Sequence, residues 1–130
     1  MPSISSDTVP QVVNFPGFCE FRAGEIAADR AFLVSFETYL KDKDWGEEMK
    51  GLPQDHCQSP HWGYVFEGRV GMRYDDGTTE EFPAGSAFYV RPGHIPITYQ
   101  GAKCLFFSTK EEGGQTLEVV HRNLLAAQAS

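Results

Sequence analysis

The stretch that decides the fold is WGYVFEGRVGMRYDDGTTEEF, residues 62–82. Apolar and polar side chains alternate along its second half, so Val70, Met72 and Tyr74 share one face of an extended segment. Charged side chains fall on the other face: Arg69, Arg73 and Asp75. This period of two predicts a β-strand with one face in a core.

Two dipeptides in this stretch predict tight turns. Asp76-Gly77 is typical of a hairpin turn, because glycine readily supplies the positive φ that such turns require. Glu67-Gly68 has the same character. A carboxylate at this point also suggests catalysis, but we favour the turn, since a hairpin needs the same dipeptide.

Similar short apolar runs cover most of the chain, separated by glycine, proline or charged residues. They are VVNF (12–15), FCEF (18–21), AFLVSFETYL (31–40), SAFYVRP (86–92), PITYQ (96–100), KCLFFST (103–109) and TLEVVH (116–121). Strands at nearly regular spacing with turn residues between them predict an all-β fold, either a sandwich or a closed antiparallel barrel.

Helical signals are weaker and predict only short peripheral helices. The best candidate is DWGEEMKG, residues 44–51, which Asp44 caps and Gly51 with Pro53 ends. Residues 25–40 can hold a helical turn instead of a strand, and NLLAAQAS, residues 123–130, can form one turn. GGQT, residues 113–116, is interpreted as a turn with no helix after it.

The length of 130 residues indicates one domain, with a flexible polar arm at 1–10 followed by a barrel domain at 11–130. The net charge is −7 and the Lys and Arg residues are scattered, which argues against nucleic acid and anionic membranes as partners. No stretch resembles a signal peptide or a membrane span. Three widely spaced cysteines suggest free thiols and a cytoplasmic location.

Three of the four histidines occur at junctions between turns and strands. His56 and His61 flank CQSP, and His94 follows Pro92-Gly93. Inward-facing imidazoles on neighbouring strands of a barrel can converge on one metal ion. The fourth histidine, His121, is interpreted as an ordinary surface or core residue.

Two motifs resemble those of the cupin superfamily over residues 50–110. DHCQSPHWGYVFEG, residues 55–68, is similar to the first cupin motif, in which paired histidines and a carboxylate precede a glycine. GSAFYVRPGHIP, residues 85–96, is similar to the second, in which a histidine follows a proline-glycine turn. The resemblance implies a small single-domain metal-binding cupin, an RmlC-like jelly-roll barrel.

The resemblance also implies a ligand set that departs from the usual one. His61 stands where the carboxylate ligand is expected, His56 pairs with Gln58 or Gln54, and His94 comes two residues before the usual histidine position. The implied site is His56, His61 and His94, with Gln58 or Gln54 as an oxygen ligand. It would hold a divalent transition metal, zinc first, with iron, nickel, manganese or copper as alternatives. Cys57 is expected to point away from His56 along a strand.

Plainer interpretations stand beside these. A histidine next to an aromatic residue is often a packing residue, and the barrel can be a cupin that has lost its metal. Tyr64 and Tyr89 either face the cavity or fill the barrel, with packing favoured. One apolar set forms either a lid over the cavity or an amphipathic cover of a barrel end: Trp45, Met49 and Leu52.

The function that the sequence favours is transformation of a small molecule at a mononuclear metal. Isomerase, lyase, cyclase and dioxygenase chemistry all stay open. The alternative is a non-catalytic cupin that binds or senses a small ligand. A homodimer is expected, with VVNF or TLEVVH as edge strands.

Overall fold

The computed structural model of the protein describes residues 3–26 and 32–129. Within them the strands are β1 (Gln11–Phe15), β2 (Cys19–Ile26), β3 (Phe32–Tyr39), β4 (Lys43–Asp44), β5 (His61–Glu67), β6 (Arg69–Tyr74), β7 (Thr79–Pro83), β8 (Ala87–Val90), β9 (His94–Thr98) and β10 (Lys103–Thr109). Two short 3-10 helices, η1 (Glu47–Met49) and η2 (Pro53–Asp55), precede β5, and one α-helix, α1 (Lys110–Ala129), ends the chain.

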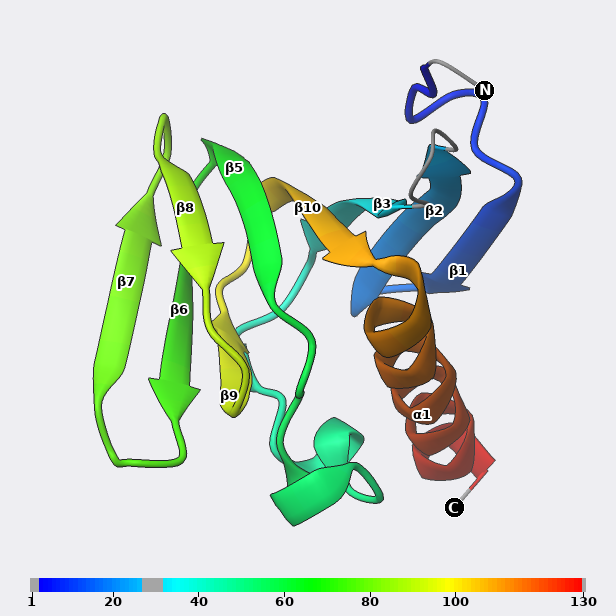
Figure 1. The fold of residues 1–130 in the computed structure, drawn as a ribbon. Coiled ribbons are helices and arrows are strands. Elements are labelled where there is room, and N and C mark those ends of the chain that lie inside the picture. The colour runs from blue at the N-terminus through cyan, green and yellow to red at the C-terminus, as the bar shows by residue number, and fades with distance from the viewer. Residues whose placement is uncertain (1–2, 27–31, 130) are drawn as a thin grey trace.

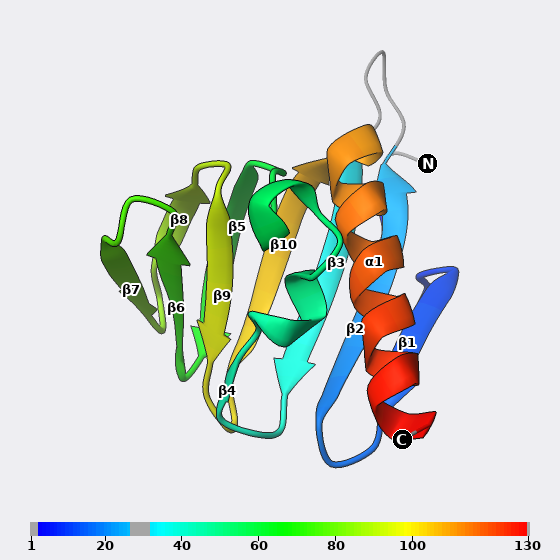
Figure 2. The same cartoon turned by 90° about the horizontal axis from the view of Figure 1, so that it is seen from below.

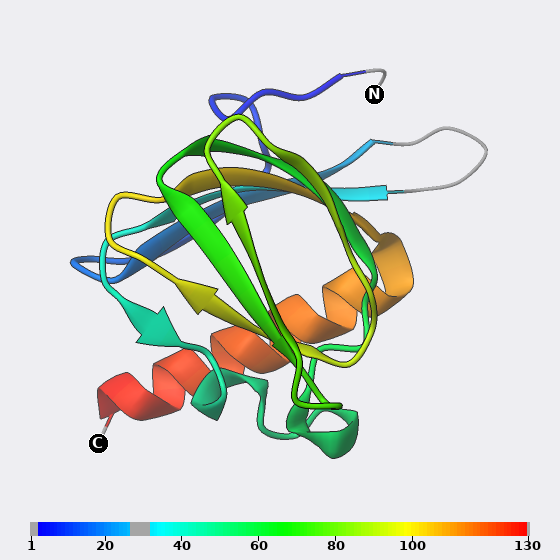
Figure 3. The same cartoon turned by 90° about the vertical axis from the view of Figure 1, so that its left-hand side faces the viewer.

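The strands form two antiparallel sheets that curve around a common interior (Figures 1 and 3). Sheet A has the order β1-β2-β3-β10-β5-β8, and sheet B has the order β4-β9-β6-β7. Strands that are distant in sequence therefore lie side by side, as β10 does between β3 and β5. The all-β prediction is confirmed.

The hairpin predicted from the central stretch forms between β6 and β7. Val70 is opposite Phe82, and Gly77 has a φ of 87° in the connecting turn. Val70, Met72 and Tyr74 are all buried, as the alternation predicted. Gly68 likewise has a positive φ of 71° where the chain turns between β5 and β6, but these strands lie in different sheets, so Glu67-Gly68 is a bend and not a hairpin turn.

The C-terminal prediction was wrong. Residues 116–121 are not a strand and 113–116 are not a turn, because Lys110–Ala129 is one continuous helix. Its buried side chains are Thr116, Val119, Val120 and Leu124, whose spacing matches one face of a helix rather than a strand. The expectation of only short peripheral helices is corrected in the same way.

Helix α1 forms part of the wall that faces sheet A. Figure 2 shows α1 lying across β2 and β3, with the short helices between it and sheet B. Sheet B thus covers one half of the larger sheet and α1 covers the other half. The helix takes the place that further strands would occupy in a fully closed barrel.

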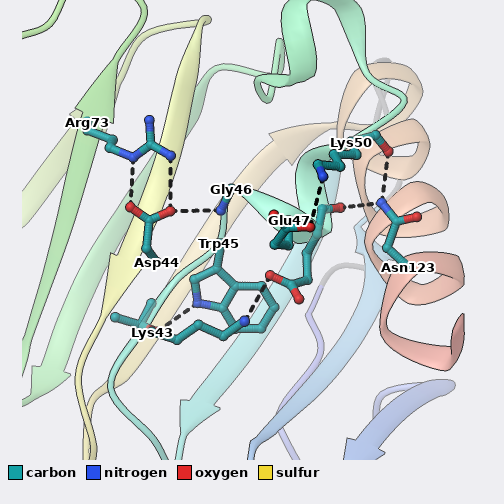
Figure 4. A network of polar contacts seen from close by, with 10 residues as sticks. Lys43, Asp44, Trp45, Gly46, Glu47, Lys50, Arg73 and Asn123 are labelled. Carbon is teal, nitrogen blue, oxygen red and sulfur yellow. Dashed lines mark hydrogen bonds and ion pairs between the residues drawn. The ribbon is translucent and has the colours of Figure 1, made fainter. Parts of the chain in front are cut away.

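Polar contacts fix the segment of residues 43–50 between the helix and sheet B (Figure 4). The Asn123 side-chain amide donates hydrogen bonds of 2.8 Å to the carbonyl oxygens of Glu48 and Lys50. On the other side, Arg73 of β6 donates two hydrogen bonds to the Asp44 carboxylate, at 2.8 and 3.1 Å. The predicted helix at 44–51 is therefore present only as the short helix η1.

Two further predictions concern the N-terminal arm and residues 25–40. Pro10 and Ile4 approach the outer side of Gly24, and Arg22 donates a hydrogen bond to the carbonyl of Ser6. The domain boundary at residue 10 stays a prediction. β2 and β3 occupy most of residues 25–40, and residues 27–31 lie outside the described part of the chain. No helix among the described residues is long and apolar enough to cross a membrane.

Candidate metal centre

A short backbone bridge brings Cys57 and His94 together. The Cys57 amide donates to the His94 carbonyl at 2.8 Å, and the His94 amide donates to the Cys57 carbonyl at 3.2 Å. Residues directly opposite each other in antiparallel pairing place their side chains on the same face. The Cys57 thiol and the His94 imidazole therefore both lie on the inner side of the wall, and both residues are buried.

His61 reaches the same place from the start of β5. It is opposite Ser108 of β10, and its Nδ1 lies 2.6 Å from the Ser108 hydroxyl oxygen. This contact sets the orientation of the ring. The His61 ring centroid is then 4.9 Å from that of His94, and its Nε2 is 3.5 Å from the Cys57 sulfur.

Cys57, His61 and His94 thus form a group in which one donor atom from each residue lies within 4.8 Å of the others. Nδ1 of His94 donates a hydrogen bond of 2.7 Å to the Arg91 carbonyl, which can only accept. In neutral His94 the lone pair therefore resides on Nε2. That atom is buried and has no hydrogen-bond partner among the described residues. A buried polar atom without a partner calls for an explanation, and a metal ion supplies one.

Burial keeps all three groups neutral in the protein alone. It lowers the pKa of His94 to about 4 and lowers the pKa of His61 well below the ordinary value, with the neighbouring His94 adding to the effect. Burial also raises the pKa of the Cys57 thiol to about 11. Two neutral imidazoles are ready ligands, whereas the thiol must lose its proton to bind a metal.

The group borders a cavity of about 60 Å³ between sheet A, sheet B and α1. This volume is several times the ~10–15 Å³ that one water molecule needs. Most of its walls are aromatic or aliphatic: Phe21, Tyr39, Trp45, Met49, Met72 and Phe106. Thr116 of α1 also lines the cavity, and its hydroxyl oxygen lies 3.3 Å from the Cys57 sulfur.

His56 and Gln58 are not part of this group. His56 is half-buried, and its Nδ1 lies 2.6 Å from the carbonyl oxygen of Gln54. The Gln58 amide nitrogen donates to the carbonyls of Pro53 and His56. Gln54 is exposed. Of the four residues expected around the metal, the structure brings together His61 and His94, and a ligand role for the others stays a prediction.

The expectation that Cys57 points away from His56 is confirmed, but the two side chains face in the opposite directions from those that the predicted ligand set requires. Neighbouring side chains do diverge along the extended segment, but Cys57 faces inward and His56 faces outward. The backbone bridge to His94 fixes this choice, and nothing in the local sequence encodes that bridge.

The structure also shows where the two candidate tyrosines and the predicted lid residues lie. Tyr64 and Tyr89 are 39% and 50% exposed, so they neither face the cavity nor fill the core. The set predicted as a lid or cover is fully buried: Trp45, Met49 and Leu52. Trp45 donates a hydrogen bond of 2.8 Å to the Thr98 hydroxyl, so this residue belongs to the core.

The sequence analysis missed a polar cluster on β3. Ser35, Glu37 and Tyr39 alternate along the strand and all line the cavity. The Tyr39 hydroxyl donates a hydrogen bond to Oε1 of Glu37, and the Ser35 hydroxyl donates one of 2.8 Å to Oε2. Their period of two in a strand whose partners are apolar was the available signal.

Solved structures with similar folds include an RmlC-like cupin. The polyketide cyclase RemF from Streptomyces resistomycificus has 21% identity and a TM-score of 0.56 over 84% of this chain and 79% of its own. An RmlC-like cupin from Shewanella frigidimarina NCIMB 400 has 14% identity and a TM-score of 0.52 over 79% of this chain and 85% of its own. The EutQ protein of Clostridium difficile has 14% identity and a TM-score of 0.51 over 79% and 72%.

These similarities identify the fold as that of the cupins, as the two sequence motifs implied. No protein-family model and no curated protein matches the sequence. At these identities the likeness establishes the fold alone.

Proposed function

We propose that Cys57, His61 and His94 bind one divalent transition metal ion and that the protein acts on a small organic molecule in the adjoining cavity. The observation that carries this proposal is the convergence of the three donor atoms within 4.8 Å, with Nε2 of His94 left without another partner. Two imidazoles and one thiolate suit zinc best among common metals, and copper is the chief competitor.

The surroundings of the group fit a metal site. Ser108 and the Arg91 carbonyl hold the Nδ1 atoms of His61 and His94, which leaves both Nε2 atoms free to bind. Such outer contacts to the non-ligating nitrogen are usual for metal-binding histidines. Three protein ligands leave a coordination position for water or substrate. A bound zinc ion would supply Lewis-acid chemistry to an oxygen atom placed there.

The donor set differs in charge from the one the sequence implied. Three histidines would leave the ion with its full double charge, whereas the Cys57 thiolate would reduce the net charge of the site to +1. The thiol must stay reduced to bind, which agrees with the expected cytoplasmic location and with three unpaired cysteines. The site favours a neutral or singly charged oxygen ligand over a strongly anionic one.

The reaction class that we favour is non-redox, as in an isomerase, lyase or cyclase. A polyketide cyclase has a similar fold, so this fold is compatible with cyclase chemistry. The similarity does not identify a substrate for this protein. The apolar walls exclude bulk water and orient a small substrate. Dioxygenase chemistry would require iron or copper in place of zinc.

Zinc content measures the proposal directly. Protein dialysed against zinc and then against metal-free buffer should retain about one equivalent, and His61→Ala and His94→Gln should retain far less. His56→Ala is the matched control, since this histidine lies outside the group and should leave the stoichiometry unchanged. Wild-type protein without bound metal would remove the proposal.

The second candidate is a metal-free barrel that binds a small ligand without changing it. The contact of 3.5 Å between the Cys57 sulfur and Nε2 of His61 favours it, because the thiol can then donate a hydrogen bond within the group. A protein that gains no metal yet binds small molecules in the cavity would support this alternative.

The protein is also proposed to be a homodimer. β1 lies at one edge of sheet A, as expected for VVNF, whereas TLEVVH belongs to α1 and offers no edge. A second surface is available on the outside of sheet A, which we call the aromatic outer face. It consists of Phe32, Trp62, Tyr64, Phe66 and Tyr89, all at least 37% exposed.

A further inference from the structure

The cavity has a second polar end that the metal group does not use. Glu37 projects into it from β3 among apolar neighbours, and each of its carboxylate oxygens accepts one hydrogen bond, from Tyr39 and from Ser35. Each oxygen keeps lone-pair capacity for a further donor. A carboxylate in an apolar cavity wall is costly to bury, and the two hydrogen bonds offset only part of that cost.

Cross-strand pairing shows how Glu37 lies relative to the metal group. Ser108, which contacts His61, is opposite Leu33, and the next inward-facing pair along the same strands is Ser35 with Phe106. Two residues of strand span about 7 Å. The hydrogen bond from Ser35 holds the Glu37 carboxylate near the Ser35–Phe106 pair. A molecule of a few atoms can therefore reach both ends of the cavity.

The titratable groups around Glu37 keep their charge state near neutral pH. Cys104 is directly opposite it on β10, Cys19 lies on β2, and Tyr39 is on its own strand. Burial raises the pKa of Cys19 to about 12 and raises the pKa of Cys104 and Tyr39 well above their ordinary values. Lys43 and Glu48 beyond them form an ion pair with each other at 3.1 Å.

Glu37 itself differs from these neighbours. Burial raises its pKa to about 7, while the hydrogen bonds from Tyr39 and Ser35 oppose that rise. A carboxyl group that changes protonation near neutral pH is well matched to proton transfer.

We propose that Glu37 is the proton-transferring residue of the cavity and that the substrate is a small neutral carbonyl compound with an acidic carbon–hydrogen bond, such as an α-hydroxy ketone. The apolar walls and the negative charge of Glu37 select against anions. The inference rests on the proposed function, because the metal group is what would receive the carbonyl oxygen.

The proposed step is balanced without any oxidant. The Glu37 carboxylate removes a proton from the carbon next to the carbonyl. The electron pair of the broken bond forms a carbon–carbon double bond, and the carbonyl π pair moves to oxygen. Return of a proton from Glu37 to carbon reverses the step, and in heavy water it leaves deuterium in the substrate.

Dihydroxyacetone in heavy water provides the test, with deuterium incorporation followed by proton NMR. The zinc content of each protein sample is measured first. Zinc-loaded wild-type protein should exchange the carbon-bound protons roughly a hundredfold faster than zinc-loaded Glu37→Gln. Glu37→Asp should recover part of the rate, and Glu118→Gln, which alters an exposed carboxylate on α1, should leave it unchanged.

The pH profile separates proton transfer from a structural role. The wild-type rate should rise with pH as Glu37 ionises, since the ionised carboxylate is the base, and the residual rate of Glu37→Gln should lack that rise. Equal exchange by zinc-loaded wild type and Glu37→Gln would overturn the inference and leave the metal site standing. Absence of zinc from wild-type protein would instead refute the proposed function.

Infrared spectra of the zinc-free protein give an independent readout. The wild type should show a protonated carboxylic acid band that Glu37→Gln lacks and that disappears as pH rises through about 7. A Glu37 side chain that is already ionised at pH 5 would contradict the inference without any reference to catalysis.

Discussion

At the scale of single residues, Glu37 is predicted to make stability depend on pH near neutrality. Its pKa is raised from 4.5 to about 7 in the folded protein. The folded state therefore holds its proton more tightly, and this contribution to stability is complete below pH 4.5 and is lost as pH rises to about 7. The loss amounts to about 3 kcal/mol.

Urea unfolding of wild type and Glu37→Gln at pH 5 and pH 8 measures this effect. The glutamine variant cannot ionise, so its free energy of unfolding relative to wild type should increase by about 2.5 kcal/mol between the two pH values. A difference that does not change with pH would show that the Glu37 pKa is not raised.

Sequence reasoning identified two of the three residues of the candidate metal centre, and it missed Glu37. His61 and His94 were found because both stand at junctions between turns and strands in cupin-like motifs. Cys57 was missed because side-chain parity shows that one of two neighbours faces inward but does not show which one. Glu37 was missed because an acidic residue within a strand is usually on the solvent face.

At the scale of elements, the close packing of α1 against β10 depends on Gly113. A Cβ atom at Gly113 would lie 2.6 Å from the Ser108 Cβ, which is closer than real contacts allow. Gly113→Ala should therefore displace the helix and lower the free energy of unfolding by about 1–3 kcal/mol. Chemical denaturation followed by circular dichroism measures this change.

Gly114 provides the matched control for that substitution. Nothing lies within 4 Å of a Cβ atom at this position, and the helix gains from alanine. Gly114→Ala should raise the free energy of unfolding by about 0.5–1 kcal/mol. Equal stability of the two alanine variants would show that the close contact of Gly113 with Ser108 does not determine how α1 packs.

Most strands were predicted from the sequence, whereas most of helix α1 was not. Alternation along residues 69–74 and the Asp76-Gly77 turn carry enough local information to define a hairpin. In the C-terminal segment, Gly113 and Gly114 resemble a turn, and Val119 and Val120 favour strands as β-branched residues. Packing against η1 and sheet A overrides these local preferences, although the spacing of Leu117, Val120 and Leu124 was a helical signal.

At the scale of the whole molecule, the aromatic outer face is the feature that predicts assembly. Trp62 and Tyr89 contact each other on adjacent strands with ring centroids 5.5 Å apart, and Phe32 packs against Trp62 at 6.4 Å. Exposed aromatic residues gathered in this way are typical of protein interfaces. We expect a twofold dimer in which this face meets its copy.

Sedimentation velocity at micromolar concentration tests the dimer. The double variant Trp62→Ser/Tyr89→Ser should weaken association at least about tenfold, as expected for aromatic anchor residues. Leu125→Ser is the control, because Leu125 is 53% exposed on α1 and is not part of the aromatic outer face. A monomeric wild-type protein, or equal weakening by Leu125→Ser, would contradict this arrangement.

The central claim is that a thiolate and two imidazoles bind one metal ion in the interior, and a cobalt titration tests it most directly. Wild-type protein should develop the absorption of a cobalt–thiolate bond that saturates at about one equivalent of Co²⁺. Cys57→Ser should lose that absorption, and His56→Ala should keep it. The claim is contradicted if wild-type protein shows no such absorption, or if Cys57→Ser retains it.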